Sequence, residues 1–374
     1  MKIYQPKPLF IERMRKLLGK DFQEYMEILK HEPVRSIRAN KLKISPEELK
    51  KRLENKGWKI SQPFKDNPEI IIVEGKFVGG NDDDKTKEDD NKKSNSINNF
   101  QGGGKQFHET KLHNSQREKL RIRGSGGNKK LIDLEPGELG RSLEHLLGYY
   151  YIQEIASMLP VLALKPKPEE LVLDLAAAPG SKTTQISAEM QNTGTVIANE
   201  ISLKRIKILA SNAERCGSMN VIITKKEGIA LCEKLKEGGV EFDKILIDAP
   251  CSGEGTLRST PVTYKMWNIN TVKKFSRIQK NMVSSAIEIL KPEGEIVYST
   301  CTHAPEENEE VVDFILKNFD NIKIEKISLP IKCRPGVTGW DGKEYDKNVI
   351  KSCRIYPQDN NTEGFFIAKF RRIG

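Results

Sequence analysis

The alternation of short apolar runs with helical segments after residue 170 is the feature that most constrains the fold of this 374-residue chain. Strands that alternate with helices of this length build a parallel sheet covered by helices on both faces. The expected strands are 171–176, 195–200, 220–225, 242–249 and 294–300, and the expected helices are 182–190, 202–216, 229–236 and 271–290. We therefore predict an α/β fold with a doubly wound, Rossmann-like sheet. An antiparallel hairpin over 354–357 and 364–371 is expected at its edge.

The first 78 residues are expected to form a separate small α+β domain. Apolar residues at helical spacing predict a helix over 11–30, and RSIRANKLK (35–43) predicts a strand. Ser45 followed by Pro46 marks a helix start, because serine caps a helix and proline is tolerated at its first position. A further strand is expected over 70–78.

Between residues 79 and 130 the composition changes to charge runs and glycine clusters with few large apolar side chains. Such a stretch buries too little apolar surface to offset its ordering entropy, so we predict a disordered insertion rather than a hidden small domain. Residues 131–374 would form the larger domain. It would be entered through a helical segment over 140–164 that contains Tyr149, Tyr150 and Tyr151.

The positive charge of the chain is confined to its first part. The formal net charge is +10, and residues 1–80 carry 18 basic and 11 acidic side chains. Residues 81–130 carry 12 and 8, whereas residues 131–374 carry 32 and 33. This distribution is typical of a basic module that holds a polyanion, attached to a neutral catalytic domain. A solvated surface with a charged tail explains the charge equally well.

Several classes of protein are excluded by the composition. The apolar runs fall short of the ~18 residues that a membrane span needs, and the polar residues 1–10, with two prolines, are no secretory signal. Six cysteines include no CxxC pair, which argues against a zinc ribbon, a thioredoxin-type site and a disulfide scaffold. We therefore expect a soluble, cytoplasmic protein with reduced thiols, no metal and no membrane contact. The oligomeric state stays open.

The turn after the first predicted strand of the sheet has the residue types of a ligand-binding turn. Small residues and a glycine let a ligand approach the backbone beside a helix amino end. The turn lacks both the GxGxxG spacing of dinucleotide sites and the P-loop spacing. Glu200 ends the second strand, where a carboxylate binds ribose hydroxyls, and Glu227 follows the third strand within reach of an adenine. Together these positions favour an S-adenosylmethionine site over a bare scaffold. The turn residues are Ala176, Ala177, Ala178, Pro179, Gly180, Ser181 and Lys182.

Two cysteines follow consecutive strands of the predicted sheet. Cys251 lies in DAPCSG after the fourth strand, and Cys301 lies in YSTCT after the fifth. Consecutive strands of such a sheet are usually neighbours, and ligands bind beyond their carboxyl ends. The two thiols should therefore face one another across the cofactor cleft. Buried small hydrophobes and a regulatory disulfide are the alternatives.

A thiol beside a methyl donor indicates methylation of carbon. C5 of a pyrimidine becomes nucleophilic only when a thiolate adds to C6, and a second group must then remove the C5 proton so that the cysteine leaves. Asp248 is placed to stabilise the charge that develops near ring N3. A thiol is mostly protonated at neutral pH, so the site must lower its pKa, and Lys182 is the candidate neighbour. Spacing alone does not say which cysteine attacks.

At these residues the sequence resembles the Sun-type family of RNA cytosine-5 methyltransferases, in particular archaeal-type members that modify tRNA. The similar segments are LDLAAAPGSKTTQ (173–185), IDAPCSGEGT (247–256), YSTCT (298–302), GFFIAKFR (364–371), LEHLLGYYYIQEIASMLP (143–160) and RSIRANKLK (35–43). The resemblance implies that Cys301 is the nucleophile and that Cys251 assists product release. It implies that Asp248 contacts the base and Lys182 supports the site. The cofactor would be lined by residues 176–182 with Glu200, Arg205, Glu227 and Asp248.

The implied partner is RNA, with tRNA favoured over rRNA. Basic residues of the first 80 positions would hold the phosphate backbone, and the catalytic cleft would receive a flipped cytosine. Arg35, Arg38 and Lys41 are the candidates for RNA binding, although each also fits an ordinary solvated charge. The family usually has Asp-Gly where this chain has Glu227-Gly228, and the 79–130 insertion has no counterpart in it. The alternative class is a non-catalytic RNA-binding assembly factor, against which the presence of both cysteines argues.

Overall fold

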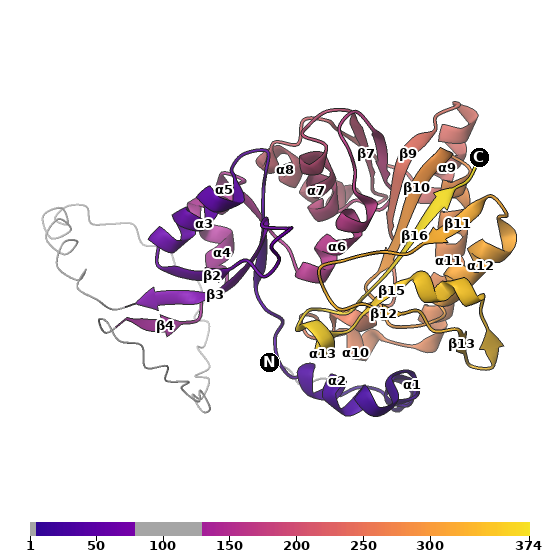
Figure 1. The fold of residues 1–374 in the computed structure, drawn as a ribbon, viewed down its shortest axis with the longest axis horizontal. Helices are drawn as coiled ribbons and strands as arrows, with labels where there is room; N and C mark the ends of the chain where they lie inside the picture. The colour runs from indigo at the N-terminus through magenta and orange to yellow at the C-terminus, as the bar shows by residue number, and fades with distance from the viewer. Residues whose placement is uncertain (1–4, 79–128) are drawn as a thin grey trace, which may run out of the picture.

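The computed structural model describes residues 5–78 and 129–374, which form two main β-sheets with their helices, a two-stranded sheet and a helical N-terminal segment (Figure 1). The predicted insertion over 79–130 lies outside the described residues except for its last two positions. Within the described ranges, no helix is both long enough and apolar enough to cross a bilayer.

The large sheet contains all five predicted strands and four more. Its strands are β6 (Leu171–Asp174), β7 (Thr195–Asn199), β8 (Val221–Thr224), β9 (Phe242–Asp248), β10 (Leu290–Thr300), β11 (Ile322–Glu325), β12 (Arg334–Pro335), β15 (Cys353–Ile355) and β16 (Phe365–Arg372). Five parallel strands stand in the order β8-β7-β6-β9-β10, and β16 pairs antiparallel with β10. The doubly wound sheet is confirmed. The C-terminal hairpin forms from β15 and β16, but β16 is not an edge strand, because it lies between β10 and β15.

Helices cover both faces of the large sheet, and strand residues alternate between the two faces. The helices on one face are α6 (Ile155–Leu164), α7 (Ser181–Glu189) and α8 (Leu203–Cys216), and those on the other are α9 (Gly228–Glu237), α11 (Ile269–Ile287) and α12 (Glu309–Asn318). In β9, Leu246 packs on the α6–α7 side, whereas Ile245 and Ile247 pack on the α9–α11 side. This period of two places the polar side chains that follow each strand at one carboxyl edge of the sheet.

The small sheet combines segments from both sides of the predicted domain boundary. Its strands are β1 (Ser36–Ala39), β2 (Trp58–Ser61), β3 (Ile70–Val78), β4 (Lys130–Ile132) and β5 (Tyr150–Ile152), and its helices are α3 (Pro46–Asn55), α4 (Glu138–Arg141) and α5 (Leu143–Leu146). The strand order is β2-β3-β1-β5, with β4 beside β3. The predicted cap is present, because the Ser45 side chain accepts the Glu48 N–H at 3.1 Å. Leu49, Leu53 and Ile71 lie in its buried core.

The predicted helix over 140–164 is wrong in its middle. Residues 150–152 form β5, which pairs antiparallel with β1, and the helix α6 begins only at Ile155. Tyrosine fits a pleated, buried surface well, and the free edge of β1 supplies the hydrogen-bond partners that a helix would otherwise provide. Tyr150 is buried, and its hydroxyl donates to the Leu139 carbonyl at 2.6 Å.

The N-terminal helices pack on the large sheet's side of the molecule rather than on the small sheet. The predicted helix over 11–30 is α1 (Pro8–Leu18), the 3-10 turn η1 (Gly19–Asp21) and α2 (Phe22–Ile28). Phe10 lies edge-on to Tyr264 and Trp267, with ring centroids 5.6 and 5.5 Å apart. Residues 36–78, 130–132 and 138–152 therefore form the small unit, whereas residues 8–28 belong to the larger one (Figure 1). The remaining short elements are η2 (Glu254–Thr256), α10 (Thr263–Met266), β13 (Gly339–Trp340), β14 (Lys343–Glu344), η3 (Lys347–Lys351) and α13 (Pro357–Asn360).

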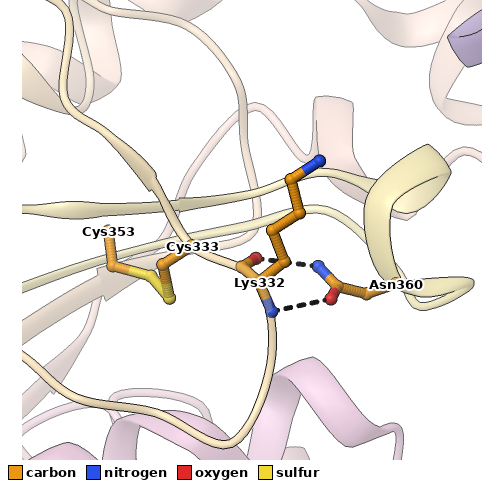
Figure 2. The surroundings of a disulfide bond; sticks show 4 residues. All are labelled: Lys332, Cys333, Cys353 and Asn360. Carbon is orange, nitrogen blue, oxygen red and sulfur yellow. Dashed lines mark hydrogen bonds between the residues drawn. A yellow bond between two sulfur atoms is a disulfide. The ribbon is translucent and has the colours of Figure 1, made fainter.

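The expectation that all thiols are reduced is wrong, because Cys333 and Cys353 form a disulfide (Figure 2). Cys353 begins β15, and Cys333 immediately precedes β12, which pairs with β15. The two Cα atoms are 5.2 Å apart, within the range that a disulfide spans. Asn360 fixes the neighbouring Lys332 backbone with two hydrogen bonds of 2.9 Å, one from N–H and one to C=O (Figure 2). Sequence spacing did not reveal the pair, because β12 has only two residues.

Candidate active site

A cavity of about 670 Å³ opens at the carboxyl edge of the large sheet, a volume that suits a ligand the size of a nucleotide or cofactor. One set of lining residues follows β6 and β9 and includes the predicted turn after β6. A second set comes from the link to the small sheet and from the segments before β16. The first set includes Asp174, Ala176, Ala177, Ala178, Pro179, Ser181, Lys182, Arg205 and Asp248, and the second includes Arg35, Glu154, Ser157, Arg258, Ser259, Glu363 and Phe365, with Cys301 in the same wall.

The turn between β6 and α7 has no room for larger side chains. Gly180 has a φ of +103°, and a Cβ there would lie 3.0 Å from Leu209 Cδ1. Only glycine adopts this left-handed backbone at no cost while α8 packs this closely. Ser181 and Lys182, the first residues of α7, line the cavity, and a helix amino end favours a negative ligand group.

Asp174 supplies an unsatisfied acceptor in this wall. Its Oδ2 accepts the Thr183 hydroxyl at 2.7 Å, whereas Oδ1 is buried with no hydrogen-bond partner among the described residues. Burial raises the pKa of Asp174 to about 7, because the carboxylate loses water and gains few donors. An ammonium or sulfonium group in the cavity would supply the missing cation. The donor set therefore fits S-adenosylmethionine, which carries both groups.

Two predicted cofactor residues are held in local interactions. Glu200 is buried, pairs with Arg205 Nη1 at 2.8 Å and accepts the Ser202 N–H at 2.9 Å. Arg205 lines the cavity and also donates to the Ala178 carbonyl, so Glu200 stands behind it. Glu227 is exposed and caps α9, accepting the Ala230 N–H at 2.9 Å, and it is not part of the cavity wall. The ribose and adenine contacts of these carboxylates stay predictions.

The two cysteines after β9 and β10 lie together, as predicted from the strand order. The Cys251 and Cys301 sulfur atoms are 3.2 Å apart, and no disulfide joins them. Contact with Cys301 raises the pKa of the Cys251 thiol well above its ordinary value, and burial and the nearby Glu307 carboxylate raise it further. The Cys251 thiol therefore keeps its proton at neutral pH, and either sulfur can donate the hydrogen bond between them. Cys301, not Cys251, lines the cavity.

A buried carboxylate fixes the Cys251 loop. Glu307 Oε2 accepts the Ser252 N–H at 3.0 Å and the Gln279 side-chain amide at 2.9 Å. The same Gln279 amide donates to the Pro250 carbonyl at 2.9 Å, so both neighbours of Cys251 are held. Burial raises the pKa of Glu307 to about 8. These contacts restrict the loop to one arrangement against the Cys301 turn.

Two glycines lock the Cys301 backbone to the strand β16. The Gly255 N–H donates to the Cys301 carbonyl at 2.9 Å, and the Gly364 N–H donates to the Gly255 carbonyl at 2.8 Å. A Cβ at Gly255 would lie 2.3 Å from the Gly364 oxygen and 2.9 Å from the Cys301 oxygen. The three backbones approach this closely because neither glycine has a side chain. These two backbone hydrogen bonds explain why the glycine-containing segments GEGT (253–256) and GFF (364–366) accompany the cysteine motifs.

Lys182 and Asp248 form an ion pair at the centre of the cavity wall. Lys182 Nζ lies 2.7 Å from Asp248 Oδ2 and donates to Ser157 Oγ at 2.9 Å. Asp248 Oδ1 accepts the Ser299 hydroxyl at 2.8 Å. Within residues 5–78 and 129–374, Lys182 makes no hydrogen bond to either cysteine sulfur, so its charge is directed at Asp248. The pair presents one donor and one acceptor to a ligand.

The three predicted RNA-binding residues differ in their accessibility. Arg38 is 3% exposed and joins the two parts of the molecule: it donates to the Ser181 carbonyl at 2.7 Å and to Thr184 Oγ1 at 2.9 Å. The predicted phosphate contact of Arg38 is therefore replaced by a structural role. Arg35 lines the cavity and donates to the Leu134 carbonyl at 3.1 Å. Lys41 is exposed and pairs with Glu189 at 2.7 Å.

Several wall residues escaped the sequence reasoning. Arg258 is buried and donates to the carbonyls of His31, Glu32 and Thr362, which ties the segment before β1 to the segment before β16. Glu363 directly precedes the GFFIAKFR segment (364–371) that carries part of the resemblance, but no role was predicted for Glu363 itself. No periodicity identifies a buried arginine whose partners are distant backbone oxygens. In the part of the chain that the structure describes, no three metal-ligating side chains are grouped as a metal site.

The sequence matches two protein families. Residues 161–371 match the family described as 16S rRNA methyltransferase RsmB/F, and residues 7–65 match the N-terminal domain of 16S rRNA methyltransferase RsmF. A tRNA (cytosine(49)-C(5))-methyltransferase of Pyrococcus abyssi is 44% identical over 67% of this chain and 78% of its own length. The ribosomal RNA small subunit methyltransferase F of Vibrio parahaemolyticus is 32% identical over 97% of this chain. The chain spans 62% of that relative, and about half of several other bacterial relatives.

Solved structures share the whole architecture. A methyltransferase homologue from Pyrococcus horikoshii has a TM-score of 0.73 at 30% identity, covering 98% of this chain and 95% of its own. NSun6 from Pyrococcus horikoshii, solved with SFG, has a TM-score of 0.72 at 26% identity, with 98% of each chain covered. The likeness therefore extends over the small sheet, the N-terminal helices and the large sheet together.

Proposed function

Because the chain belongs to the RsmB/F family of methyltransferases, we propose that it methylates C5 of a cytosine in RNA with S-adenosylmethionine as methyl donor. The observation that carries this proposal is the pair of cysteine sulfurs, 3.2 Å apart, at the wall of a cavity that also holds the Lys182–Asp248 ion pair. A methyl transfer to nitrogen or oxygen needs no thiol, whereas a transfer to C5 of a pyrimidine needs a nucleophile at C6. The Sun-type resemblance agrees with this family membership.

Cys301 is the attacking residue in our proposal. Its thiolate adds to C6 of the ring, the Cys301 sulfur–C6 bond forms, and the C5=C6 electrons make C5 nucleophilic. Asp248 and Lys182 lie where charge develops on the ring, and their ion pair keeps a donor available there. The exposure of Cys301 to the cavity supports this assignment, since a nucleophile must reach its substrate.

Cys251 assists release of the product. Once a base has taken the C5 proton, the C5=C6 bond re-forms and Cys301 leaves as a thiolate. The Cys251 S–H lies 3.2 Å from that sulfur and stabilises the departing negative charge by donating a hydrogen bond. The high pKa of Cys251 supports a donor role, because the residue keeps its proton at neutral pH.

S-adenosylmethionine supplies the electrophilic methyl group when it is bound. The turn over 176–182 leaves space for it, Asp174 Oδ1 provides an acceptor for its cationic end, and Arg205 with Glu200 flank the same wall. Gly180 keeps the backbone open at this point. These residues bind and orient the donor and exclude water from the reacting atoms.

The RNA would enter between the two parts of the molecule. The cavity is lined both by the link to the small sheet, including Arg35, and by the large sheet's loops. Arg35 reaches this opening, and exposed Lys41 lies further along the same segment. We propose that these two residues contact phosphates next to the flipped cytosine.

We propose tRNA as the substrate, supported by the relative from Pyrococcus abyssi that bears a tRNA-modifying name at 44% identity. Ribosomal RNA is the second candidate, favoured by the match of residues 7–65 to an RsmF domain. Incubation of the protein with purified tRNA and 16S rRNA transcripts, followed by bisulfite sequencing, distinguishes them. If a cytosine is methylated in just one of the two RNAs, that RNA is the substrate.

The covalent step has a direct test. The protein is incubated with RNA and labelled S-adenosylmethionine, and the products are separated on a denaturing gel. Wild type should transfer label to RNA, and Cys301→Ala should transfer none. Cys251→Ala should accumulate a covalent protein–RNA adduct, because Cys301 adds but leaves slowly. Methyl transfer by Cys301→Ala at the wild-type rate would overturn the assignment of the nucleophile.

A further inference from the structure

Glu363 carries the second unpaired carboxylate oxygen of the cavity wall, besides Asp174 Oδ1. The residue is 4% exposed and lines the cavity. Its Oε1 accepts the Ser259 N–H at 2.8 Å, whereas Oε2 is buried and has no hydrogen-bond partner among the described residues. An unpaired buried carboxylate oxygen destabilises the fold, so such an atom in a ligand cavity indicates a donor on the ligand.

Two other carboxylates of the cavity wall, those of Asp248 and Glu154, have partners on both oxygens. Asp248 accepts Ser299 Oγ and pairs with Lys182. Glu154 accepts the Glu363 N–H at 3.0 Å and the Ser157 N–H at 3.2 Å. Burial raises the pKa of Glu363, while the contacts with Ser259 and the positive charge of Arg258 partly oppose this. Two further carboxylate oxygens nearby are unpaired: Asp174 Oδ1 belongs to the turn after β6, and Glu307 Oε1 lies beside the Cys251 loop, outside the cavity wall.

Glu363 is also tied to the nucleophile through the backbone. The next residue, Gly364, donates to the Gly255 carbonyl, and Gly255 donates to the Cys301 carbonyl. Phe365, one residue further on, lines the cavity with its ring centroid 5.4 Å from Lys182 Nζ. The segment 363–365 thus presents an acceptor and an aromatic ring on the Cys301 side of the cavity.

We propose that Glu363 is a specificity-determining residue that accepts a hydrogen bond from the exocyclic amine of the target cytosine. This inference rests on the proposed function. Cytosine offers two N–H donors at C4, whereas uracil offers a carbonyl oxygen there. A carboxylate oxygen attracts the amine and repels the carbonyl. A site built around such a hydrogen bond rejects the analogue that lacks it by several orders of magnitude in favourable cases.

Glu363→Gln is the informative substitution. Glutamine keeps the size of the side chain, and its oxygen can still accept the Ser259 N–H. Its amide nitrogen then replaces Oε2 and offers a donor to the base, which suits a carbonyl and opposes an amine. Glu144→Gln is the matched control, because Glu144 is an equally buried glutamate in the small unit that pairs with Lys56 away from the cavity.

The experiment uses two RNAs that differ only at the target base, one with 5-fluorocytidine and one with 5-fluorouridine. Fluorine at C5 cannot be removed as a proton is, so the Cys301 adduct persists after methyl transfer and is counted on a denaturing gel. Wild type and Glu144→Gln should form the cytidine adduct on the order of 10²-fold faster than the uridine adduct. Glu363→Gln should slow the cytidine reaction by about 10- to 100-fold and bring the ratio of the two rates close to one.

Each other outcome has a definite meaning. An unchanged ratio in Glu363→Gln, with both rates equal to wild type or lowered equally, overturns the role of Glu363. No adduct between wild type and either RNA overturns the proposed function itself. If Glu363→Gln does not fold, by thermal melting, Glu363→Ala takes its place, and it should lose the preference for cytidine without gaining uridine reactivity. Retention of the cytidine preference by Glu363→Ala also contradicts the proposal.

Discussion

Cys251 and Cys301 follow two parallel strands at the carboxyl edge of the large sheet, whereas Cys333 and Cys353 join β12 to β15 at its antiparallel side. The first pair has sulfur atoms 3.2 Å apart and stays reduced. The second pair forms a disulfide within the hydrophobic cluster under α6. Cys301 packs against the same apolar cluster as Cys333 and Cys353, but only the first pair borders the cavity and has Glu307 beside it.

This difference shows that distance between sulfurs does not determine the use of a cysteine pair. The strand ends hold Cys251 and Cys301 on separate loops, which Glu307, Gln279 and Gly255 fix against one another. The thiols therefore stay close without joining, and one remains available to a substrate. Cys353 lies on β15, and Cys333 directly precedes its partner strand β12. The bond between them stabilises the fold by restricting the unfolded chain.

Replacing the nucleophile should give the largest effect. Cys301→Ser keeps the size of the side chain but offers an oxygen whose hydroxyl is far less nucleophilic than a thiolate, so we expect kcat/KM for RNA methylation to fall at least ~10³-fold. The melting temperature should stay within about 2 °C of wild type. Transfer of labelled methyl groups to RNA and differential scanning calorimetry measure the two quantities. A variant with more than a tenth of wild-type activity would break the proposed division between the two pairs.

Removing the disulfide should have the opposite signature. The loop closed by Cys333 and Cys353 spans 20 residues, so a Cys333→Ala/Cys353→Ala variant should lose about 2–4 kcal/mol in free energy of unfolding. Its methylation rate at 25 °C should remain within about twofold of wild type, because neither Cys333 nor Cys353 lines the cavity. Urea unfolding with and without dithiothreitol checks the prediction. Equal urea midpoints for wild type and variant would show that the bond contributes nothing to stability.

Glu307, which is buried beside the Cys251 loop, should make the free energy of unfolding depend on pH. Burial raises the pKa of Glu307 to about 8 from an ordinary value of 4.5, so the folded state holds one more proton than the unfolded state between these values. Wild-type stability is therefore lost as pH rises through this window. Glutamine does not titrate, so Glu307→Gln should not lose stability in this range. Between pH 5 and pH 8.5 its free energy of unfolding should rise by about 1–3 kcal/mol relative to that of wild type. Parallel stability curves in urea titrations would contradict the assignment.

Removing the charge of Lys41, in the small unit, should leave both cysteine pairs unaffected and should weaken RNA binding only slightly. Lys41 pairs with Glu189 near the surface, so Lys41→Gln should change the free energy of unfolding by less than about 0.5 kcal/mol. If Lys41 contacts a phosphate, RNA affinity should fall by about two- to threefold and the salt dependence should weaken by about one ion. Lys236→Gln is the control, because Lys236, near the C-terminal end of α9, is likewise an exposed lysine paired with one glutamate, Glu288. Filter binding at several salt concentrations should separate the two variants.

Much of the active site follows from local sequence because parallel strands bring distant residues to one edge. The consecutive strands β9 and β10 bring Asp248 and Cys301 together, as predicted. The strand β6, which carries Asp174, pairs with β9 through a change in strand order that strand–helix alternation does not specify. The small residues of the turn after β6 likewise report a close approach of backbone and ligand. These inferences use rules that act over a few residues or between consecutive strands.

Other features depend on contacts that have no local signature. Arg38 was predicted to bind RNA because it lies in a basic strand, yet β1 is buried on both faces and its arginine satisfies carbonyls of α7. The tyrosines at 149–151 have a helical context, but Tyr150 and Tyr151 pair with the open edge of β1 as part of a strand. Glu363 and Arg258 have partners more than 100 residues away in sequence. Tertiary structure alone determines these roles.

The placement of the first helices has a consequence for synthesis of the chain. Phe10 and Tyr25 are buried against residues 257–356, so α1 and α2 leave the ribosome long before their partners exist. The small sheet also waits for β5, which follows β3 by some seventy positions. Contacts of this sequence separation close late and slowly. A nascent chain would therefore expose an amphipathic N-terminal segment throughout translation, and holdase chaperones that recognise such segments are the factors on which its yield should depend.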